Sequence, residues 1–242
     1  MAALHGFTLN GAQFAPVESH RLQWHAPDLP GHGRTQVDPI DVPTTVSVLG
    51  HWLQSFDGPP PLLGYSQGGR LALLVALEHP DLVDRLVLVS TSPGVQDEAD
   101  RKARRRSDED LAGRIEAIGL DAFLNEWLEG PVTGTSHLSE DVCRTDRSVR
   151  NENTAAGLAS ALRVLGQGAQ PFVGDRLNEL EMPVLTISGE RDEKYERLAS
   201  AIATSVRDGR HVSIPDAGHN VVLDAPTELA ALVANFCKIG SP

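Results

Sequence analysis

The residues most able to do chemistry are a serine in a glycine-rich turn and, later in the chain, an aspartate and a histidine. Ser66 lies in residues 64–69 (GYSQGG), which follow a short apolar run and open a helical pattern. A strand–turn–helix of this kind strains the serine and exposes its hydroxyl at a helix N-terminus, where the helix dipole favours negative charge. Glycines are needed on both sides because side chains there would collide with the neighbouring strand and helix. The pattern predicts an activated serine rather than an incidental one.

An activated serine needs a base, and the base needs an acid to orient it. His219 lies in residues 216–220 (DAGHN), after the last expected strand and before the last expected helix. Asp192 follows the preceding expected strand, so the chain order is serine, acid, histidine. Glu190 competes for the acid role but lies closer to the strand end. We therefore favour Ser66, Asp192 and His219 as the catalytic residues.

Charge that develops on a substrate oxygen needs hydrogen-bond donors. One should be the backbone N–H of Gln67, directly after the serine. The other should come from the loop after the first strand, residues 5–8 (HGFT), where the N–H of Phe7 is the natural candidate. His5 in that loop is expected to fix the loop rather than act as a base. Residues 29–33 (LPGHG) form a tight turn, which we interpret as structural.

The elements that must position these residues alternate between short apolar runs and helical patterns, which is typical of a parallel α/β sheet. The expected strands are residues 2–4, 22–26, 61–64, 83–89, 184–188 and 211–214. The expected helices are residues 44–56, 67–78, 196–205 and 227–236. The sequence thus predicts an α/β fold in which one domain spans residues 1–242.

The alternation stops at about residue 94 and resumes at about residue 181. This stretch is charged at first and then has a helical pattern anchored by Ile115, Ile118, Phe123 and Trp127. Residues 107–110 resemble a capping box with aspartate as the acid, which predicts a helix start there. A helical insertion after one strand predicts a cap over the carboxyl edge of the sheet, where ligands bind in open α/β folds.

Composition narrows the class of protein further. The formal net charge of −12 argues against nonspecific binding to nucleic acid or a membrane surface. Cys143 and Cys237 are far apart and have no partner motif, so we expect buried thiols in a reducing compartment and no metal site. No signal peptide or membrane span is expected, because the chain has neither a basic start followed by an apolar stretch nor a long apolar run. We expect a cytoplasmic protein without a cofactor; its oligomeric state stays open.

Taken together, the motifs resemble the α/β-hydrolase superfamily and, within it, the 2-succinyl-6-hydroxy-2,4-cyclohexadiene-1-carboxylate synthases of menaquinone biosynthesis. The matching segments are residues 4–7 (LHGF), 28–33 (DLPGHG), 64–70 (GYSQGGR), 189–194 (GERDEK) and 217–220 (AGHN). In the insertion, Pro93, Gly94, Arg104, residues 106–108, Trp127 and residues 150–153 (RNEN) also match the family. Only Met1 to Leu4 precede His5, which is a shorter first strand than we expect for this family.

The resemblance implies a lyase that eliminates pyruvate from 2-succinyl-5-enolpyruvyl-6-hydroxy-3-cyclohexene-1-carboxylate. This substrate carries three carboxylates, and Arg70, Arg104 and Arg150 would supply three cationic partners able to bind them bidentately. Tyr65 and Trp127 match positions that line the substrate pocket in the family. Packing in the protein core is the alternative role for either residue.

Two other functions fit the same motifs. A carboxylic-ester hydrolase would use Ser66 as a true nucleophile. A noncatalytic ligand-binding protein on the hydrolase fold is the third hypothesis, and the complete set of Ser66, Asp192 and His219 argues against it.

Overall fold

The computed structural model describes residues 1–17, 22–35, 40–130, 133–135 and 137–238. Its centre is a five-stranded parallel sheet in which strand order follows chain order, β1-β2-β3-β4-β5. The strands are β1 (Ala2–Leu4), β2 (Leu62–Tyr65), β3 (Leu86–Val89), β4 (Val184–Gly189) and β5 (Gly209–Ile214). Because all strands run the same way, the loops after their carboxyl ends meet along one edge of the sheet.

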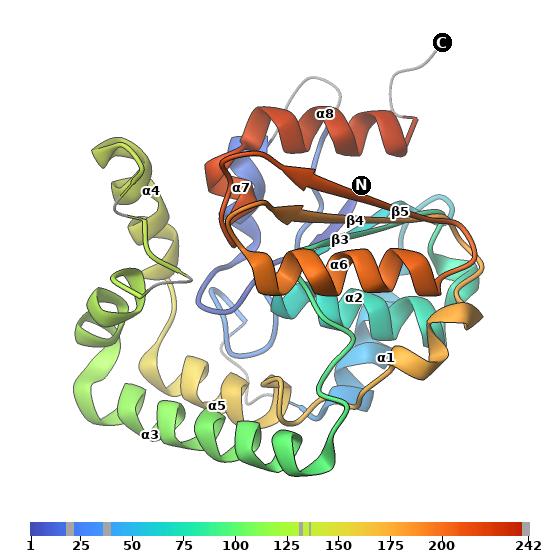
Figure 1. Ribbon diagram of the computed structural model, residues 1–242. Helices are drawn as coiled ribbons and strands as arrows, with labels where there is room; N and C mark the ends of the chain where they lie inside the picture. Colours follow the sequence, from blue (N-terminus) through green and yellow to red (C-terminus); the bar gives the residue numbers. More distant parts are fainter. Residues whose placement is uncertain (18–21, 36–39, 131–132, 136, 239–242) are drawn as a thin grey trace.

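Helices cover both faces of the sheet and make three layers (Figure 1). One face packs against α1 (Val42–Leu53), α2 (Gln67–Glu78) and α6 (Glu193–Ser205). The other packs against the 3-10 helix η1 (Gly11–Val17) and helices α7 (Val221–Asp224) and α8 (Pro226–Phe236). Neighbouring strand residues alternate between the two cores, as the two-residue period of a strand requires: Leu62 faces the first and Leu63 the second.

Between β3 and β4 the chain forms α3 (Glu98–Leu128), α4 (Glu140–Arg150), α5 (Ala155–Leu165) and the 3-10 helix η3 (Gly174–Glu179). A further 3-10 helix, η2 (Pro80–Leu82), joins α2 to β3. Helices α3 and α5 lie side by side, and α4 stands apart from the sheet layers (Figure 1). Residues such as Ile115, Phe123 and Leu158 give α3 and α5 a small apolar core of their own. Gly119 interrupts α3 with a left-handed backbone (φ 80°), which kinks the helix.

Most of the predicted elements are confirmed, with ends shifted by up to three residues, and α2 matches at both ends. The predicted strand at residues 22–26 is wrong: the structure has no strand of the sheet there, and His25 makes an isolated bridge to Ala2 of β1. The predicted helix start at residues 107–110 is also wrong. Helix α3 begins at Glu98, where the Asp97 carboxylate caps the Asp100 N–H at 2.9 Å, and Ser107 lies inside the helix.

The remaining expectations concern cysteines, metals and membranes. Both cysteines are free thiols; Cys237 is buried, whereas Cys143 is only half-buried, contrary to the expectation. No group of acidic, histidine or cysteine side chains among the described residues is placed to hold a metal ion. Within the same residues, no helix is both long and apolar enough to cross a bilayer.

Candidate active site

Ser66 stands at the sharp turn between β2 and α2. Its backbone is left-handed (φ 51°, ψ −109°), a strained conformation for a residue with a side chain. A Cβ on Gly64 would lie 2.5 Å from the Gly68 carbonyl oxygen, and one on Gly68 would lie 2.2 Å from that of Leu4. No real side chain fits at such distances, so the predicted need for glycine on both sides of the serine is confirmed. The turn thereby holds the Ser66 hydroxyl at the carboxyl edge of the sheet.

A chain of two hydrogen bonds connects Ser66 to an acid. The Ser66 Oγ lies 3.1 Å from Nε2 of His219, and the other ring nitrogen, Nδ1, lies 2.6 Å from Oδ2 of Asp192. With Nδ1–H donating to the carboxylate, Nε2 is left free to accept the serine proton. The structure therefore brings together the three residues proposed from the sequence, in an arrangement that can activate a hydroxyl.

The loops around this chain hold the acid and the base in place. Asp192 caps α6 by accepting the Tyr195 N–H at 3.3 Å through Oδ1, which leaves Oδ2 for His219. Glu190, the competing acid, instead accepts the Asp216 N–H at 3.5 Å. The His219 loop is tied down by Asp224, whose Oδ2 accepts the Gly218 N–H at 2.6 Å.

The loop after β1 carries the other predicted oxyanion donor, Phe7. His5 is fully buried; its Nε2 accepts the Leu29 N–H at 2.8 Å while Nδ1–H donates to the Gly6 carbonyl at 2.9 Å. Burial lowers the pKa of His5 to about 4, so the ring is neutral at pH 7 and holds the loop as an uncharged support. The loop-fixing role expected for His5 thus agrees with its contacts.

A cavity of about 490 Å³ opens above Ser66 and His219, lined on its other side by α3 and α5 residues such as Leu111 and Leu162. Its walls include Phe7, Tyr65, Gln67, Arg70, Arg104, Trp127 and Arg150, so every predicted oxyanion and substrate-binding residue borders it. Two buried side-chain donors in the wall, Gln67 Nε2 and Trp127 Nε1, have no hydrogen-bond partner in the described part of the chain. Burial raises the pKa of Tyr65, so its phenol stays neutral.

The three predicted arginines differ in how much of their charge is compensated. Arg104 is paired with Asp108 at 2.7 Å, and the buried Arg150 is bidentate to Asp146 at 2.7 and 3.1 Å. Arg70 instead donates from Nε to the uncharged Gln170 at 2.8 Å. Burial lowers the pKa of Arg70 to about 10, so it stays cationic at neutral pH. Of the three, Arg70 therefore offers the least compensated charge.

Lys194 was not singled out from the sequence, yet it lines the same cavity. Its Nζ lies 5.3 Å from the centre of the Tyr195 ring, and no carboxylate among the described residues pairs with it. The signal that could have found it is the segment 189–194 (GERDEK), which places a lysine two residues after Asp192 at the start of α6. Arg70 and Lys194 thus place two cations without a carboxylate partner among the described residues in this cavity. The carboxylates that line it are Glu126, which is paired with Arg114, and Asp192, which is bonded to His219.

The fold and this site define the class of protein. A model of the Alpha/beta hydrolase family matches residues 3–232, nearly the whole chain. The parallel sheet and the serine on a strand–helix turn are what that class predicts.

Individual relatives are more specific. An Enterobacter sp. protein named 2-succinyl-6-hydroxy-2,4-cyclohexadiene-1-carboxylate synthase is 31% identical over 250 residues, which cover 98% of this chain and 90% of the relative. A Bacillus subtilis protein is 38% identical over 176 residues, 72% of this chain and 64% of that protein. The solved structure of MenH from S. aureus superimposes with a TM-score of 0.92 at 29% identity, covering 98% of this chain and 92% of that one. The chain therefore belongs to the α/β-hydrolase family and, within it, to the group named 2-succinyl-6-hydroxy-2,4-cyclohexadiene-1-carboxylate synthases.

Proposed function

We propose that this protein eliminates pyruvate from 2-succinyl-5-enolpyruvyl-6-hydroxy-3-cyclohexene-1-carboxylate, the synthase step of menaquinone biosynthesis. The observation that carries the proposal is one cavity lined by a serine–histidine–aspartate chain and by two cations, Arg70 and Lys194, that pair with no carboxylate in the described part of the chain. A substrate with three carboxylates needs such local positive charge to enter a chain of net charge −12. The names of the relatives give the product of this reaction, 2-succinyl-6-hydroxy-2,4-cyclohexadiene-1-carboxylate.

The chemistry begins with a proton transfer. His219 takes the Ser66 proton through Nε2, and Asp192 stabilises the imidazolium that forms. The Ser66 oxygen then removes the proton from the ring carbon that carries the succinyl carbonyl. The electrons of the broken C–H bond form a new ring double bond, the existing ring double bond shifts, and the bond to the enolpyruvyl oxygen breaks. The proton held by the His219 imidazolium goes to the leaving enolate, which becomes pyruvate, so Ser66 ends as a hydroxyl and His219 as a neutral ring. The serine acts as a base because the succinyl carbonyl carries no leaving group.

Two sets of groups would lower the barrier. Negative charge develops on the succinyl oxygen, where the Gln67 and Phe7 N–H groups are the proposed donors. The cations of the cavity would hold the carboxylates so that the reacting proton faces Ser66. Arg104 and Arg150 keep a supporting part in this proposal, since guanidinium donors remain on each beyond those engaged by Asp108 and Asp146.

We also propose that residues 94–181 act as a cap. Arg104 and Trp127 on α3 and Leu162 on α5 line the cavity opposite the sheet edge. A cover of this kind excludes water, which strengthens the electrostatic interactions inside. Cap and sheet remain parts of one domain in this proposal.

The test is a pair of assays run in parallel on the same preparation. Wild-type protein is mixed with the enolpyruvyl substrate while pyruvate is followed, and separately with a neutral aryl ester. We expect pyruvate release that is lost in Ser66→Ala and little ester cleavage. Rapid ester cleavage without pyruvate would instead assign a carboxylic-ester hydrolase. If folded wild-type protein turned over neither substrate, the hypothesis of a noncatalytic ligand-binding protein would be the one that remains.

A further inference from the structure

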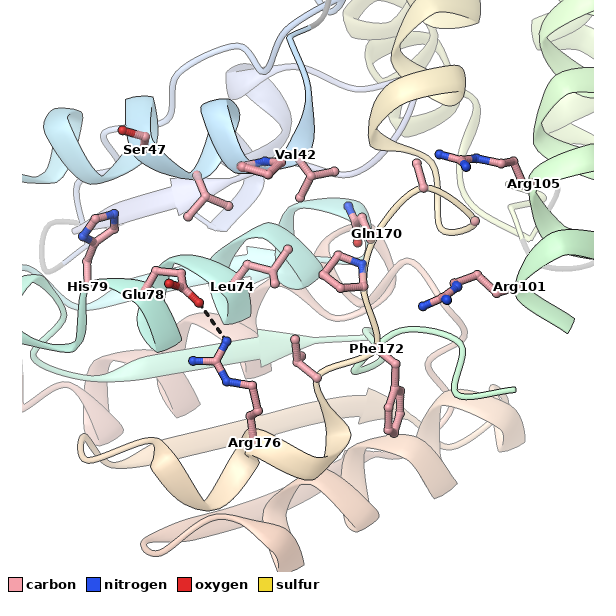
Figure 2. A pocket seen from close by; sticks show the side chains of 16 residues that line it. Val42, Ser47, Leu74, Glu78, His79, Arg101, Arg105, Gln170, Phe172 and Arg176 are labelled. Carbon is pink, nitrogen blue, oxygen red and sulfur yellow. Dashed lines mark hydrogen bonds and ion pairs between the residues drawn. The ribbon is translucent and has the colours of Figure 1, made fainter. Parts of the chain in front are cut away.

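A second and larger cleft lies beside the active cavity. It has a volume of about 840 Å³ and is bordered by α1, α2, α3 and the segment from Gly168 to Arg176 (Figure 2). Gln170 lines this cleft and accepts a hydrogen bond from Arg70, which lines the active cavity. None of the proposed catalytic residues borders it, so the reaction proposed for the active cavity assigns this cleft no role. Its volume is in the range of small-molecule sites.

The middle of the cleft is apolar. Val42 and Val46 come from α1, Leu74 from α2, and Phe172 and Val173 from the segment that follows α5. In Figure 2, Val42 and Leu74 lie between the charged side chains of the two ends. A ligand that binds here by burying apolar surface would need an apolar part of its own.

One end of the cleft is cationic and uncompensated. Arg101 and Arg105 are one helical turn apart on α3, and both point towards the segment that carries Gln170 and Phe172 (Figure 2). Among the described residues neither arginine has a carboxylate within ion-pair distance, whereas Arg104 and Arg163 nearby are paired with Asp108 and Glu109. Two adjacent planar cations repel each other, and a bound carboxylate would relieve that repulsion.

The other end repels anions. Glu78 lies there, and the Arg176 that contacts it at 2.8 Å is shared with Glu179 at 2.9 Å. Two carboxylates on one guanidinium leave this end without net positive charge. An anionic group in the cleft is therefore directed to Arg101 and Arg105, with its apolar part over Val42 and Leu74.

From this polarity we infer that the cleft is a binding site for an amphipathic carboxylate: an apolar body lying over Val42, Val46 and Leu74, and one carboxylate held by Arg101 and Arg105. The inference does not depend on the reaction proposed for the active cavity.

Binding can be tested by isothermal titration calorimetry with submicellar decanoate as the probe, at low salt. Decan-1-ol tests the need for charge, and acetate tests the need for the apolar body. We expect decanoate to bind and the other two to bind at least about tenfold more weakly. Absence of decanoate binding, or equal binding of decanol or acetate, would overturn the inference.

Substitutions then locate the probe. Arg101→Ala/Arg105→Ala should weaken decanoate binding at least about tenfold. A tenfold change corresponds to roughly 1.5 kcal/mol, the typical contribution of a hydrogen bond to a charged group. Lys102→Ala/Arg106→Ala is the matched control, because it removes the same charge from exposed positions of the same helix that do not line the cleft. Ser47→Trp, at an exposed position on the rim, should block the cleft by volume alone.

The results separate three explanations. Loss in the Arg101/Arg105 variant and in Ser47→Trp, but not in the Lys102/Arg106 control, supports the site. Equal loss in both double variants would mean general electrostatic attraction and would refute it. Weakening by Lys194→Ala with none in the Arg101/Arg105 variant would place the probe in the active cavity, which also refutes it.

Discussion

Replacing Arg150 should damage the fold as well as the active cavity, because its ion pair with Asp146 is buried. Only 3% of the Arg150 side chain and 2% of the Asp146 side chain are exposed. Arg150→Ala leaves the Asp146 carboxylate buried and uncompensated, a situation that costs about 3–5 kcal/mol. The substitution also removes the hydrogen bond from Arg150 to the Thr8 hydroxyl, on the loop that carries Phe7. We therefore expect lower stability and lower activity together.

The size of the effect sets the measurement. For a domain of this length, 3–5 kcal/mol corresponds to a fall in Tm of about 6–20 °C. Urea unfolding followed by far-UV circular dichroism gives the free energy of unfolding directly. Arg144→Ala is the control on the same helix: Arg144 pairs with Asp141 at 3.1 Å, both side chains are mostly exposed, and the loss should cost about 1 kcal/mol or less.

A double variant separates the buried charge from the lost side chain. Asp146→Leu/Arg150→Met removes both charges, and replacing a buried ion pair with apolar residues is often neutral for stability. We expect it to recover most of the stability lost in Arg150→Ala. The reasoning would be refuted if Arg150→Ala were as stable as Arg144→Ala, or if the double variant were less stable than Arg150→Ala.

Three further predictions concern the acid, the cations and pH. Asp192→Asn should lower kcat by roughly 10⁴, whereas Glu190→Gln should stay near wild type in the pyruvate assay; the reverse result would give the acid role to Glu190. Arg70→Ala and Lys194→Ala should each weaken binding of the tricarboxylate by about 1.5–3 kcal/mol and leave cleavage of a neutral ester, if measurable, largely unchanged; equal losses on both substrates would mean that these cations only support the fold. Burial lowers the pKa of His5 to about 4 and that of His32 to about 3, so both are neutral in the folded state and take up protons below about pH 6.5 only on unfolding. Their contribution to stability is full above pH 6.5 and is lost as pH falls towards 4 and 3, by up to about 1.4 kcal/mol per pH unit for each. Urea unfolding between pH 7 and 4 should show a dependence of the free energy of unfolding on pH that His32→Asn reduces, and an unchanged dependence in His32→Asn would contradict the assignment.

The sequence was informative where local chemistry decides the structure. Ser66 could be found because the turn tolerates only glycine at Gly64 and Gly68, and that requirement is visible in the residue types. The start of α2 at Gln67 follows from the same turn. Asp192 and His219 could be placed because each follows a strand that reads as a short apolar run, and parallel strands bring such loops to one edge.

The sequence was misleading where contacts with other parts of the chain decide whether an element forms or where it begins. Residues 22–26 have a strand-like pattern, but β1 is only three residues long and pairs with them at one bridge, so no strand forms. The start of α3 was misplaced because Asp97 and Ser107 are both good capping residues, and only the first lies at the helix end.

The spacing of acidic residues and arginines along the helices already indicates which arginines are paired. Arg104–Asp108 and Asp146–Arg150 have the four-residue spacing of helical ion pairs, which predicts that two of the three cations are compensated within their own helices. The burial of Arg150 and the orientation of Lys194 into the cavity depend on tertiary packing, which spacing alone does not give.

The central claim is that Ser66 removes a proton and does not form a bond to the substrate. Rapid-quench mass spectrometry during a single turnover tests it, with pyruvate and the mass of the Ser66 peptide measured in the same samples. The account predicts that pyruvate appears at the rate of catalysis while the Ser66 peptide keeps its unmodified mass at every time point. A substrate adduct on Ser66 that forms and decays at the rate of pyruvate release would contradict it and make Ser66 a nucleophile.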